Sequence, residues 1–226
     1  MKTLVIDVGG THVKVLVTGK RRHLQFDSGP RMTAKAMVAD VKQATAKAGW
    51  TYQVIAMGYP GPVLDSHPMA APPNLGPGWV GFNFRKAFGR PVKIINDAAM
   101  QALGSYRGGR MLFLGLGTGL GSALIVDSVL EPLELAHLPF KKGRTYEDFA
   151  GIKGLERLGK RKWRKCVLEA MQQLRAATLA EYVVLGGGNA RLMKNLPPYA
   201  CLGDNANAFR GGFRLWQNKA ARRICY

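Results

Sequence analysis

Residues 4–17 read LVIDVGGTHVKVLV, and this stretch decides the fold class. Leu4 to Val8 and His12 to Val17 are short apolar runs, and Gly9-Gly10-Thr11 separates them. The predicted structure is two strands paired through a tight turn, because paired glycines favour such a turn. The second half repeats this arrangement around Gly117-Thr118-Gly119. We therefore expect two lobes whose glycine turns face a common site.

Outward from these turns, short apolar runs alternate with helical patterns, which is typical of an α/β protein. Further predicted strands are Leu24 to Asp27, Val54 to Met57, Val92 to Ile95, Met111 to Leu116, Ser122 to Val126 and Tyr182 to Leu185. Predicted helices are one that Thr33 caps and that ends at Ala48, then Phe84 to Phe88, Ala98 to Tyr106, Tyr146 to Thr178 with a break at Gly159, Asn189 to Lys194, and Asn205 to Ala221. We place the N-terminal lobe at residues 1–108, completed by a C-terminal helix at about 207–226, and the C-terminal lobe at residues 109–206.

The composition describes a strongly basic protein with an ordinary core. The chain has 226 residues, of which 33 are Lys or Arg and 14 are Asp or Glu, so its formal net charge is +19. A hydrophobic content of 47% excludes a disordered chain. Three cysteines without a CxxC pair exclude a disulfide scaffold and favour the cytoplasm, and we expect neither a signal peptide nor a membrane span. The charge fits nucleic acid, a membrane surface, a polyanionic substrate or solubility alone.

The first glycine turn carries groups suited to phosphate. Gly9 and Gly10 let backbone N–H groups approach an anion, Thr11 adds a hydroxyl, and Lys14 follows. Asp7 at the strand end could hold Mg²⁺ through water. A hairpin without any ligand is the alternative.

The second turn is richer in glycine than a hairpin requires. Residues 115–121 read GLGTGLG, and Gly117, Thr118 and Gly119 could grip a phosphate chain together with the first turn. Gly187 and Gly188 lie at a later junction between a strand and a helix, which is a potential anion or nucleotide site. Close packing of strand and helix is the alternative reading of that junction.

Polar residues at two further places could act on a hydroxyl substrate. Asn96 and Asp97 follow a predicted strand, where Asp97 could accept a hydroxyl proton during phosphoryl transfer or could merely cap the next helix. Glu134 and His137, with Glu147 ten residues further on, are natural partners for sugar hydroxyls, although plain surface polarity is the alternative.

A basic cluster occupies the long predicted helix. Trp163, Val167, Met171 and Leu174 form its apolar stripe. Lys160, Arg161, Arg164 and Lys165 fall on a neighbouring face, with few acidic residues nearby. That face is either solvated or binds an anion.

The order of these motifs resembles the ROK family of sugar kinases, in the actin-like ATPase superfamily. The motifs that carry the resemblance are DVGGTHVK at 7–14, PGP at 60–62, PNL at 73–75, NDA at 96–98, GTGLG at 117–121, ELAH at 134–137 and GGG at 186–188. More narrowly, YED at 146–148, KWRK at 162–165 and LGDNA at 202–206 look like the polyphosphate glucokinase branch.

The resemblance implies an actin-like (ribonuclease H-like) two-lobed fold with the active site in the cleft between lobes, and a homodimer. It makes Asp97 the catalytic base for the sugar 6-hydroxyl. The implied sugar-binding residues are Asn74, Asn96, Asp97, Glu134, His137 and Glu147. The implied residues for the phosphate donor and its Mg²⁺ are Asp7, Gly9, Gly10, Thr11, Lys14, Gly117, Thr118 and Gly119, with Gly187 and Gly188 where ATP-using relatives place adenosine.

The chain also departs from the family pattern. Many ROK kinases carry a cysteine-rich zinc motif after the Glu/His segment, whereas Lys141-Lys142-Gly143-Arg144 stands here without cysteine, so no zinc site is predicted. Ala136 replaces the usual glycine before His137.

The leading hypothesis is a Mg²⁺-dependent transfer of a phosphoryl group from inorganic polyphosphate to glucose. Lys160, Arg161, Arg164 and Lys165 would form a track for the donor polyanion. An ATP-dependent hexokinase acting on glucose or mannose is the alternative. A non-catalytic nucleic-acid-binding protein is a third reading, but no base-stacking motif or DNA-reading helix supports it.

Overall fold

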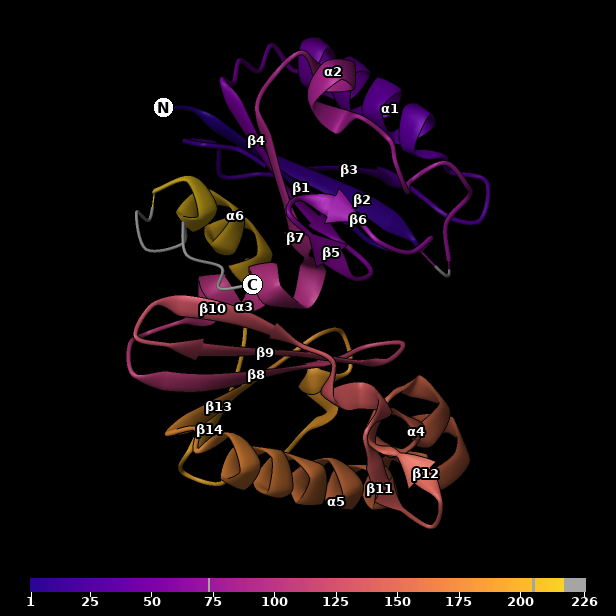
Figure 1. Ribbon diagram of the computed structural model, residues 1–226, viewed down its shortest axis with the longest axis vertical. Helices are drawn as coiled ribbons and strands as arrows, with labels where there is room; N and C mark the ends of the chain where they lie inside the picture. The colour runs from indigo at the N-terminus through magenta and orange to yellow at the C-terminus, as the bar shows by residue number, and fades with distance from the viewer. Residues whose placement is uncertain (73, 205, 218–226) are drawn as a thin grey trace. The chain divides into compact units, whose positions relative to one another are not determined.

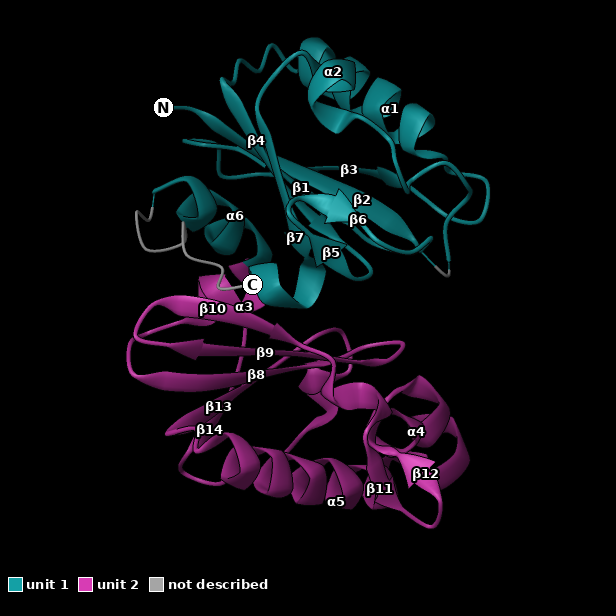
Figure 2. Cartoon of the chain, viewed as in Figure 1, with its two compact units in different colours: residues 1–100, 208–218 teal, residues 101–207, 219–226 magenta. Residues whose placement is uncertain are grey.

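The computed structural model describes residues 1–72, 74–204 and 206–217. Contacts divide the chain into two compact units: residues 1–100 with α6 (Asn207–Gln217) from Ala208 onward, and residues 101–207 (Figure 2). The chain passes from the first unit to the second between Met100 and Gln101, inside α3 (Asp97–Ser105). The boundary was predicted after residue 108, so the observed one comes earlier in the chain. The part of the predicted last helix at 218–226 lies outside the described residues.

The first unit is built on a five-stranded sheet of order β3-β2-β1-β4-β7 (Figure 1). Its strands are β1 (Thr3–Val8), β2 (His12–Val17), β3 (Leu24–Asp27), β4 (Val54–Tyr59) and β7 (Val92–Asn96). Its other elements are α1 (Ala34–Lys47), α2 (Phe84–Phe88) and a small hairpin of β5 (Val63–Leu64) and β6 (His67–Pro68).

Alternation along β1 explains how this sheet is covered on both faces. Leu4 and Ile6 point into the core shared with α1, which Thr33 caps through its hydroxyl, as predicted. Val5 points to the other face, where it packs so closely on Gly212 of α6 that a Cβ at Gly212 would overlap it. Because both faces are buried, β1 reads as a continuous apolar run rather than an alternating one.

The second unit contains a sheet of order β10-β9-β8-β13-β14. Its strands are β8 (Arg110–Leu116), β9 (Leu120–Val126), β10 (Val129–Leu133), β13 (Tyr182–Gly186) and β14 (Ala200–Leu202). Its other elements are the 3₁₀ turns η1 (Leu135–His137) and η2 (Ala190–Leu192), the hairpin β11 (Pro139–Lys141) and β12 (Arg144–Thr145), and helices α4 (Tyr146–Ala150) and α5 (Ile152–Thr178). The predicted stripe of Trp163, Val167, Met171 and Leu174 is buried against this sheet.

The two sheets repeat one topology. In each, three antiparallel strands are followed by two parallel ones, and the glycine turn joins the central strand to its antiparallel neighbour. The predicted pairing of strands through Gly9-Gly10-Thr11 and through Gly117-Thr118-Gly119 is therefore confirmed.

Three helix predictions are corrected by the structure. The stretch from Tyr146 to Thr178 is two helices, because Gly151 adopts an extended conformation between them. The predicted break at Gly159 is confirmed by its φ of 71°. The predicted helix from Asn189 to Lys194 is only the single turn η2, since Met193 is already extended. Ala206 lies in a turn, so the last helix begins at Asn207, and the predicted start at residue 205 lies outside the described residues.

Among the helices in the described ranges, none combines the length and the hydropathy that a membrane span requires.

Candidate active site

Several predicted site residues of the first unit lie at one edge of its sheet. β1, β4 and β7 run parallel, and the register sets Asp7 beside Gly58 and Gly58 beside Ile95. Asn96 and Asp97 follow directly, at the same carboxyl edge as Asp7. This edge is where open α/β sheets collect their ligands.

The sequence left open whether Asp97 acts as a base or caps the next helix, and the structure gives the capping role to Asn96. The Asn96 Oδ1 accepts hydrogen bonds from the N–H groups of Ala98 (2.9 Å) and Ala99 (3.1 Å), and its Nδ2 donates to the Gly61 carbonyl (3.1 Å). Asn96 is thus the residue that caps α3, and most of its side-chain hydrogen-bonding capacity is used. Asp97 is the first residue of the helix, and its Oδ1 also accepts from Ala98 N–H (2.8 Å).

The first glycine turn keeps some of its N–H groups for the hairpin. Gly9 N–H donates to the His12 carbonyl (3.0 Å), so this group is occupied. Ser28 braces the turn, since its hydroxyl donates to Gly9 O (2.6 Å) and its N–H to Thr11 O (2.9 Å). In the described part of the chain, the N–H groups of Gly10 and Thr11 have no acceptor. These two donors are available to an anion.

Asp7 lies beside this turn in a partly buried position. Burial raises the pKa of its carboxyl, while the positive charges of Lys14 and His23 act to lower it. Lys14 is its cross-strand partner in the register. Within the described ranges the carboxylate has no hydrogen-bond partner, and no cluster of three or more His, Cys, Asp or Glu side chains could hold a metal. A lone carboxylate fits Mg²⁺, which takes few protein ligands and otherwise binds water and donor phosphates.

Asn74, predicted from the resemblance to bind sugar, lies against the first turn. A Cβ at Gly10 would lie 3.0 Å from the Asn74 Cβ, so any larger residue at this position would press on the Asn74 side chain. Nothing in the spacing of two residues so far apart in the chain predicts the contact.

The second glycine turn is held by three hydrogen bonds that its backbone accepts or donates. Gly117 N–H donates to Gly119 O (3.1 Å), the Asn189 Nδ2 donates to Gly117 O (3.2 Å), and Ile152 N–H donates to Thr118 O (3.1 Å). The N–H groups of Thr118 and Gly119 have no acceptor among the described residues. The second turn therefore presents the same pair of adjacent donors as the first.

Glu147 packs directly on the second turn. Its Oε2 accepts from Leu120 N–H (3.2 Å) and occupies the space into which a Cβ at Gly119 would project. The residue predicted to bind sugar thus touches the turn predicted to bind the donor. Like Asn74 on Gly10, Glu147 lies against a glycine of its turn.

An aromatic cluster fixes α4, the helix that carries Glu147. Phe140 stacks on Tyr146, with 4.6 Å between ring centroids, and meets Phe149 edge-on at 5.4 Å. The Lys141 ammonium lies 4.6 Å from the Phe140 ring centroid and 2.6 Å from a Glu169 carboxylate oxygen. These contacts join the cysteine-free β11–β12 hairpin to α4 and α5.

Glu134 directly precedes η1 and His137 is its last residue, and both side chains are exposed. The Ser122 hydroxyl anchors this segment to β9 by accepting from Leu135 N–H (3.2 Å). η1 contacts α4, so the second unit brings Glu134, His137 and Glu147 onto adjoining segments.

The two later glycines differ in what they do. Gly187 has a φ of 80°, and a Cβ there would lie 2.5 Å from the Leu116 carbonyl oxygen, so its glycine is required by packing. Gly188 has no atom within 4 Å of the place of a Cβ and borders open space.

Three of the four residues of the predicted polyphosphate track are exposed, and the fourth forms a hydrogen bond within the protein. Lys160, Arg161 and Lys165 are exposed on α5, whereas Arg164 is half-buried and its Nε donates to the Leu192 carbonyl (2.5 Å).

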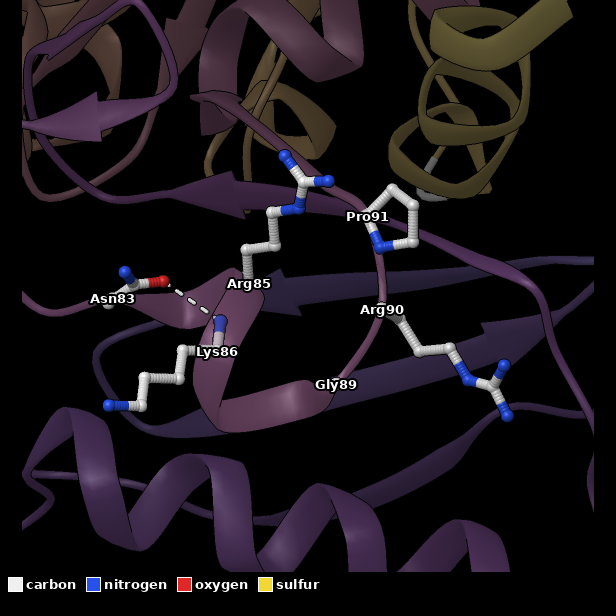
Figure 3. A pocket seen from close by; sticks show the side chains of 6 residues that line it. All are labelled: Asn83, Arg85, Lys86, Gly89, Arg90 and Pro91. Carbon is white, nitrogen blue, oxygen red and sulfur yellow. Dashed lines mark hydrogen bonds between the residues drawn. The ribbon is translucent and has the colours of Figure 1, made fainter.

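A surface hollow of about 390 Å³ is lined by basic side chains, but it lies away from the predicted site residues of the first unit (Figure 3). Arg85, Lys86 and Arg90 line it, and their side chains point away from one another. Pro91 directly precedes β7, whereas Asn96 is the last residue of that strand, about 15 Å away along it. No predicted site residue lines this hollow.

The model of the ROK family matches residues 3–131, which is more than half of the chain. The chain belongs to the ROK family. Among curated relatives of this ROK chain, a protein named polyphosphate glucokinase from Mycobacterium tuberculosis is 28% identical over 207 residues, covering 82% of the chain and 77% of the relative. Another of that name from Mycobacterium leprae is 27% identical over 210 residues, and the match spans only 63% of that relative's length.

Solved structures share the fold of this ROK chain. The inorganic polyphosphate/ATP-glucomannokinase of Arthrobacter sp. strain KM matches with a TM-score of 0.81 and 22% identity, covering 96% of the chain and 99% of that protein. A ROK family glucokinase from Streptomyces griseus, solved with glucose and AMPPNP, matches with a TM-score of 0.78 and 16% identity, covering 96% and 100%. The predicted α/β, actin-like fold is confirmed.

Sequence reasoning missed the residues that brace the turns. Ser28, Asn189 and Ile152 each bond to a turn from a distant segment. Only Asn189 carried a signal, as the polar residue directly after three glycines.

Proposed function

We propose that this ROK chain transfers the terminal phosphoryl group of inorganic polyphosphate to the 6-hydroxyl of glucose. The observation that carries the proposal is the pair of matching glycine turns, each with two adjacent N–H groups free to bind phosphate oxygens. The names of the mycobacterial relatives and of the Arthrobacter structure support the choice of glucose and polyphosphate.

The reaction needs one proton acceptor and one donor-binding surface. The glucose 6-hydroxyl oxygen attacks the terminal phosphorus, and a new O–P bond forms. The bond from that phosphorus to the next phosphate breaks, which leaves a polyphosphate shorter by one unit. Asp97, at the carboxyl edge of the first sheet, takes the hydroxyl proton. Asn74, Glu134, His137 and Glu147 hold the sugar hydroxyls.

Phosphate binding would fall to backbone donors more than to side chains. Gly10 and Thr11 in the first unit, and Thr118 and Gly119 in the second, supply N–H groups, while Lys14 adds a positive charge. Mg²⁺, held through water by Asp7, would neutralise charge on the donor phosphates. The exposed Lys160, Arg161 and Lys165 would bind phosphates further along the donor chain.

ATP is the second donor to consider, because the space at Gly188 is open. The Arthrobacter protein's name includes both donors, and the Streptomyces glucokinase was solved with an ATP analogue. An ATP-dependent hexokinase would use the same base and the same turns.

Initial rates with glucose and Mg²⁺ test the proposal, with polyphosphate or ATP as the only donor. A larger kcat/KM with polyphosphate is expected. Turnover with ATP alone would make the chain an ATP-dependent hexokinase, and no transfer from either donor would contradict the proposed kinase.

A further inference from the structure

Two segments of the second unit carry positive charge without any acidic residue. Residues 159–168 contain five Lys or Arg residues and no Asp or Glu. Residues 186–203 contain Arg191 and Lys194, again with no Asp or Glu, and both side chains are exposed. The predicted site residues include basic residues of the first segment, whereas in the second segment they include only glycines.

The fold brings these two segments together. Arg164 of α5 donates its Nε hydrogen to the Leu192 carbonyl at 2.5 Å, and Leu192 is the last residue of η2. Arg191 and Lys194 flank the residues at this contact. The charges of α5 therefore continue onto the η2 segment.

The η2 segment in turn adjoins the second glycine turn. The Asn189 N–H donates to the Leu116 carbonyl (2.9 Å), and its Nδ2 donates to the Gly117 carbonyl (3.2 Å). Gly187 packs on the backbone of Leu116, and Gly188 borders open space. The second glycine turn is thus connected to α5 through the segment from Asn189 to Leu192, which contains Arg191.

These charges lack internal compensation. Across residues 1–72, 74–204 and 206–217, no carboxylate forms an ion pair with Arg191, Lys194 or the basic residues of 159–168. Like charges gathered on one surface repel each other, and a bound polyanion relieves that repulsion.

We propose that Arg191 and Lys194 bind the donor polyphosphate between the second glycine turn and α5. Resting on the proposed function, this inference adds a binding segment that joins the reactive end of the donor to Lys160, Arg161 and Lys165. A linear phosphate chain matches the surface because its charges repeat along its whole length.

The same surface offers little to the bases of a nucleic acid. Binding of single strands depends on aromatic side chains on which bases stack. Trp163 is buried in the core, and the Tyr199 ring is covered by the Arg175 guanidinium at 4.3 Å from the ring centroid. The observations therefore favour a phosphate chain over single-stranded RNA or DNA, and duplex DNA is left to the test.

The test compares the double variant Arg191→Ala/Lys194→Ala with a charge-matched control, Arg90→Ala/Lys47→Ala. The control removes one Arg and one Lys that are exposed in the first unit. Affinity for long-chain polyphosphate is measured by direct titration without glucose, and KM is measured with long-chain polyphosphate and with tripolyphosphate.

The test variant should bind long-chain polyphosphate about tenfold more weakly than wild type, and its KM for that donor should rise in proportion. The slope of log affinity against log salt should fall by about 1.5, because two phosphate contacts are lost. The KM for tripolyphosphate should rise less, since a short donor does not reach past the turn. The control should lose much less affinity.

Equal losses in the two variants would overturn the inference, because they would reflect net charge alone. Displacement of polyphosphate by duplex DNA at equal phosphate concentration would also overturn it. If wild type transfers no phosphoryl group from polyphosphate, the proposed function fails, and the titration still decides whether Arg191 and Lys194 bind the chain.

Discussion

The two glycine turns occupy the same place in two sheets of the same topology, yet their surroundings differ. The first turn lies beside Asp7 and shares its sheet edge with Asp97. The second turn lies beside a surface whose Lys and Arg side chains form no ion pairs within the described residues. Glu147 is an acidic side chain that contacts this turn. Under the proposed function, the comparison predicts a division of labour, in which the first unit would supply the base and the metal ligand and the second would bind the length of the donor.

Both turns also carry a polar side chain on a glycine. Asn74 lies on Gly10 and Glu147 lies on Gly119. Both were predicted to bind sugar, so within each unit a predicted sugar-binding side chain touches a turn predicted to bind the donor. Because each contact fills the space of a Cβ, sugar binding and donor binding should influence each other.

The largest expected effect is the loss of kcat when the proposed base of the first unit is replaced. Asp97→Asn removes the base, and kcat should fall by about 10²–10⁴-fold while the KM for polyphosphate changes little. The measurement is steady-state kinetics with long-chain polyphosphate and glucose. Turnover at the wild-type level would remove Asp97 from the mechanism and the base from the first unit.

A smaller loss is expected at the predicted metal ligand. Asp7→Asn should lower kcat/KM by about 10- to 100-fold, as is usual when a group that acts on a metal through an intermediate ligand is lost. Raising the Mg²⁺ concentration should recover part of the activity. A loss that no Mg²⁺ concentration relieves would contradict the role of Asp7 in holding the metal.

The contact between Gly119 and Glu147 should matter about tenfold. In Gly119→Ala the new Cβ displaces the carboxylate and breaks its bond to Leu120 N–H, so the donor KM should rise by about that factor. Gly117→Ala is the matched comparison, because no atom lies within 4 Å of its Cβ position. An equal rise in both variants would show that the contact with Glu147 is irrelevant to donor binding.

Asp7 should also leave a small mark on stability. Burial raises the pKa of the Asp7 carboxyl in the folded state above its ordinary value of 3.8, so between these two pKa values the folded protein holds more protons than the unfolded one. The stability of wild type should therefore fall as pH rises from about 4 through the raised pKa, by an amount that Asp7→Asn abolishes. Thermal unfolding of both proteins across this pH range, without Mg²⁺, measures the difference. Parallel curves would contradict it.

The sequence predicted local structure well where one segment carries its own signal. Thr33 caps α1, Gly159 breaks α5, and the apolar stripe from Trp163 to Leu174 is buried. The sequence failed where distant segments decide the outcome. Asn189 donates its side-chain N–H to the Gly117 carbonyl instead of starting a full helix, and Asn96 rather than Asp97 caps α3.

The site shows the same limit. Ordered motifs predicted which residues matter, but not that Asn74 and Glu147 lie on the glycine turns. Neither did they predict that Arg164 bonds to the Leu192 carbonyl, next to Arg191, since that contact depends on the folded position of η2. The repeated topology of the two sheets likewise has no counterpart in a sequence repeat beyond the turns themselves.

Salt dependence tests the division of labour most directly. With wild type, the KM for long-chain polyphosphate and the KM for glucose are measured from low to physiological salt. A donor that many Lys and Arg residues hold releases counterions from both partners, so its KM should rise steeply while the KM for glucose stays level. A donor KM that does not respond to salt would contradict the account.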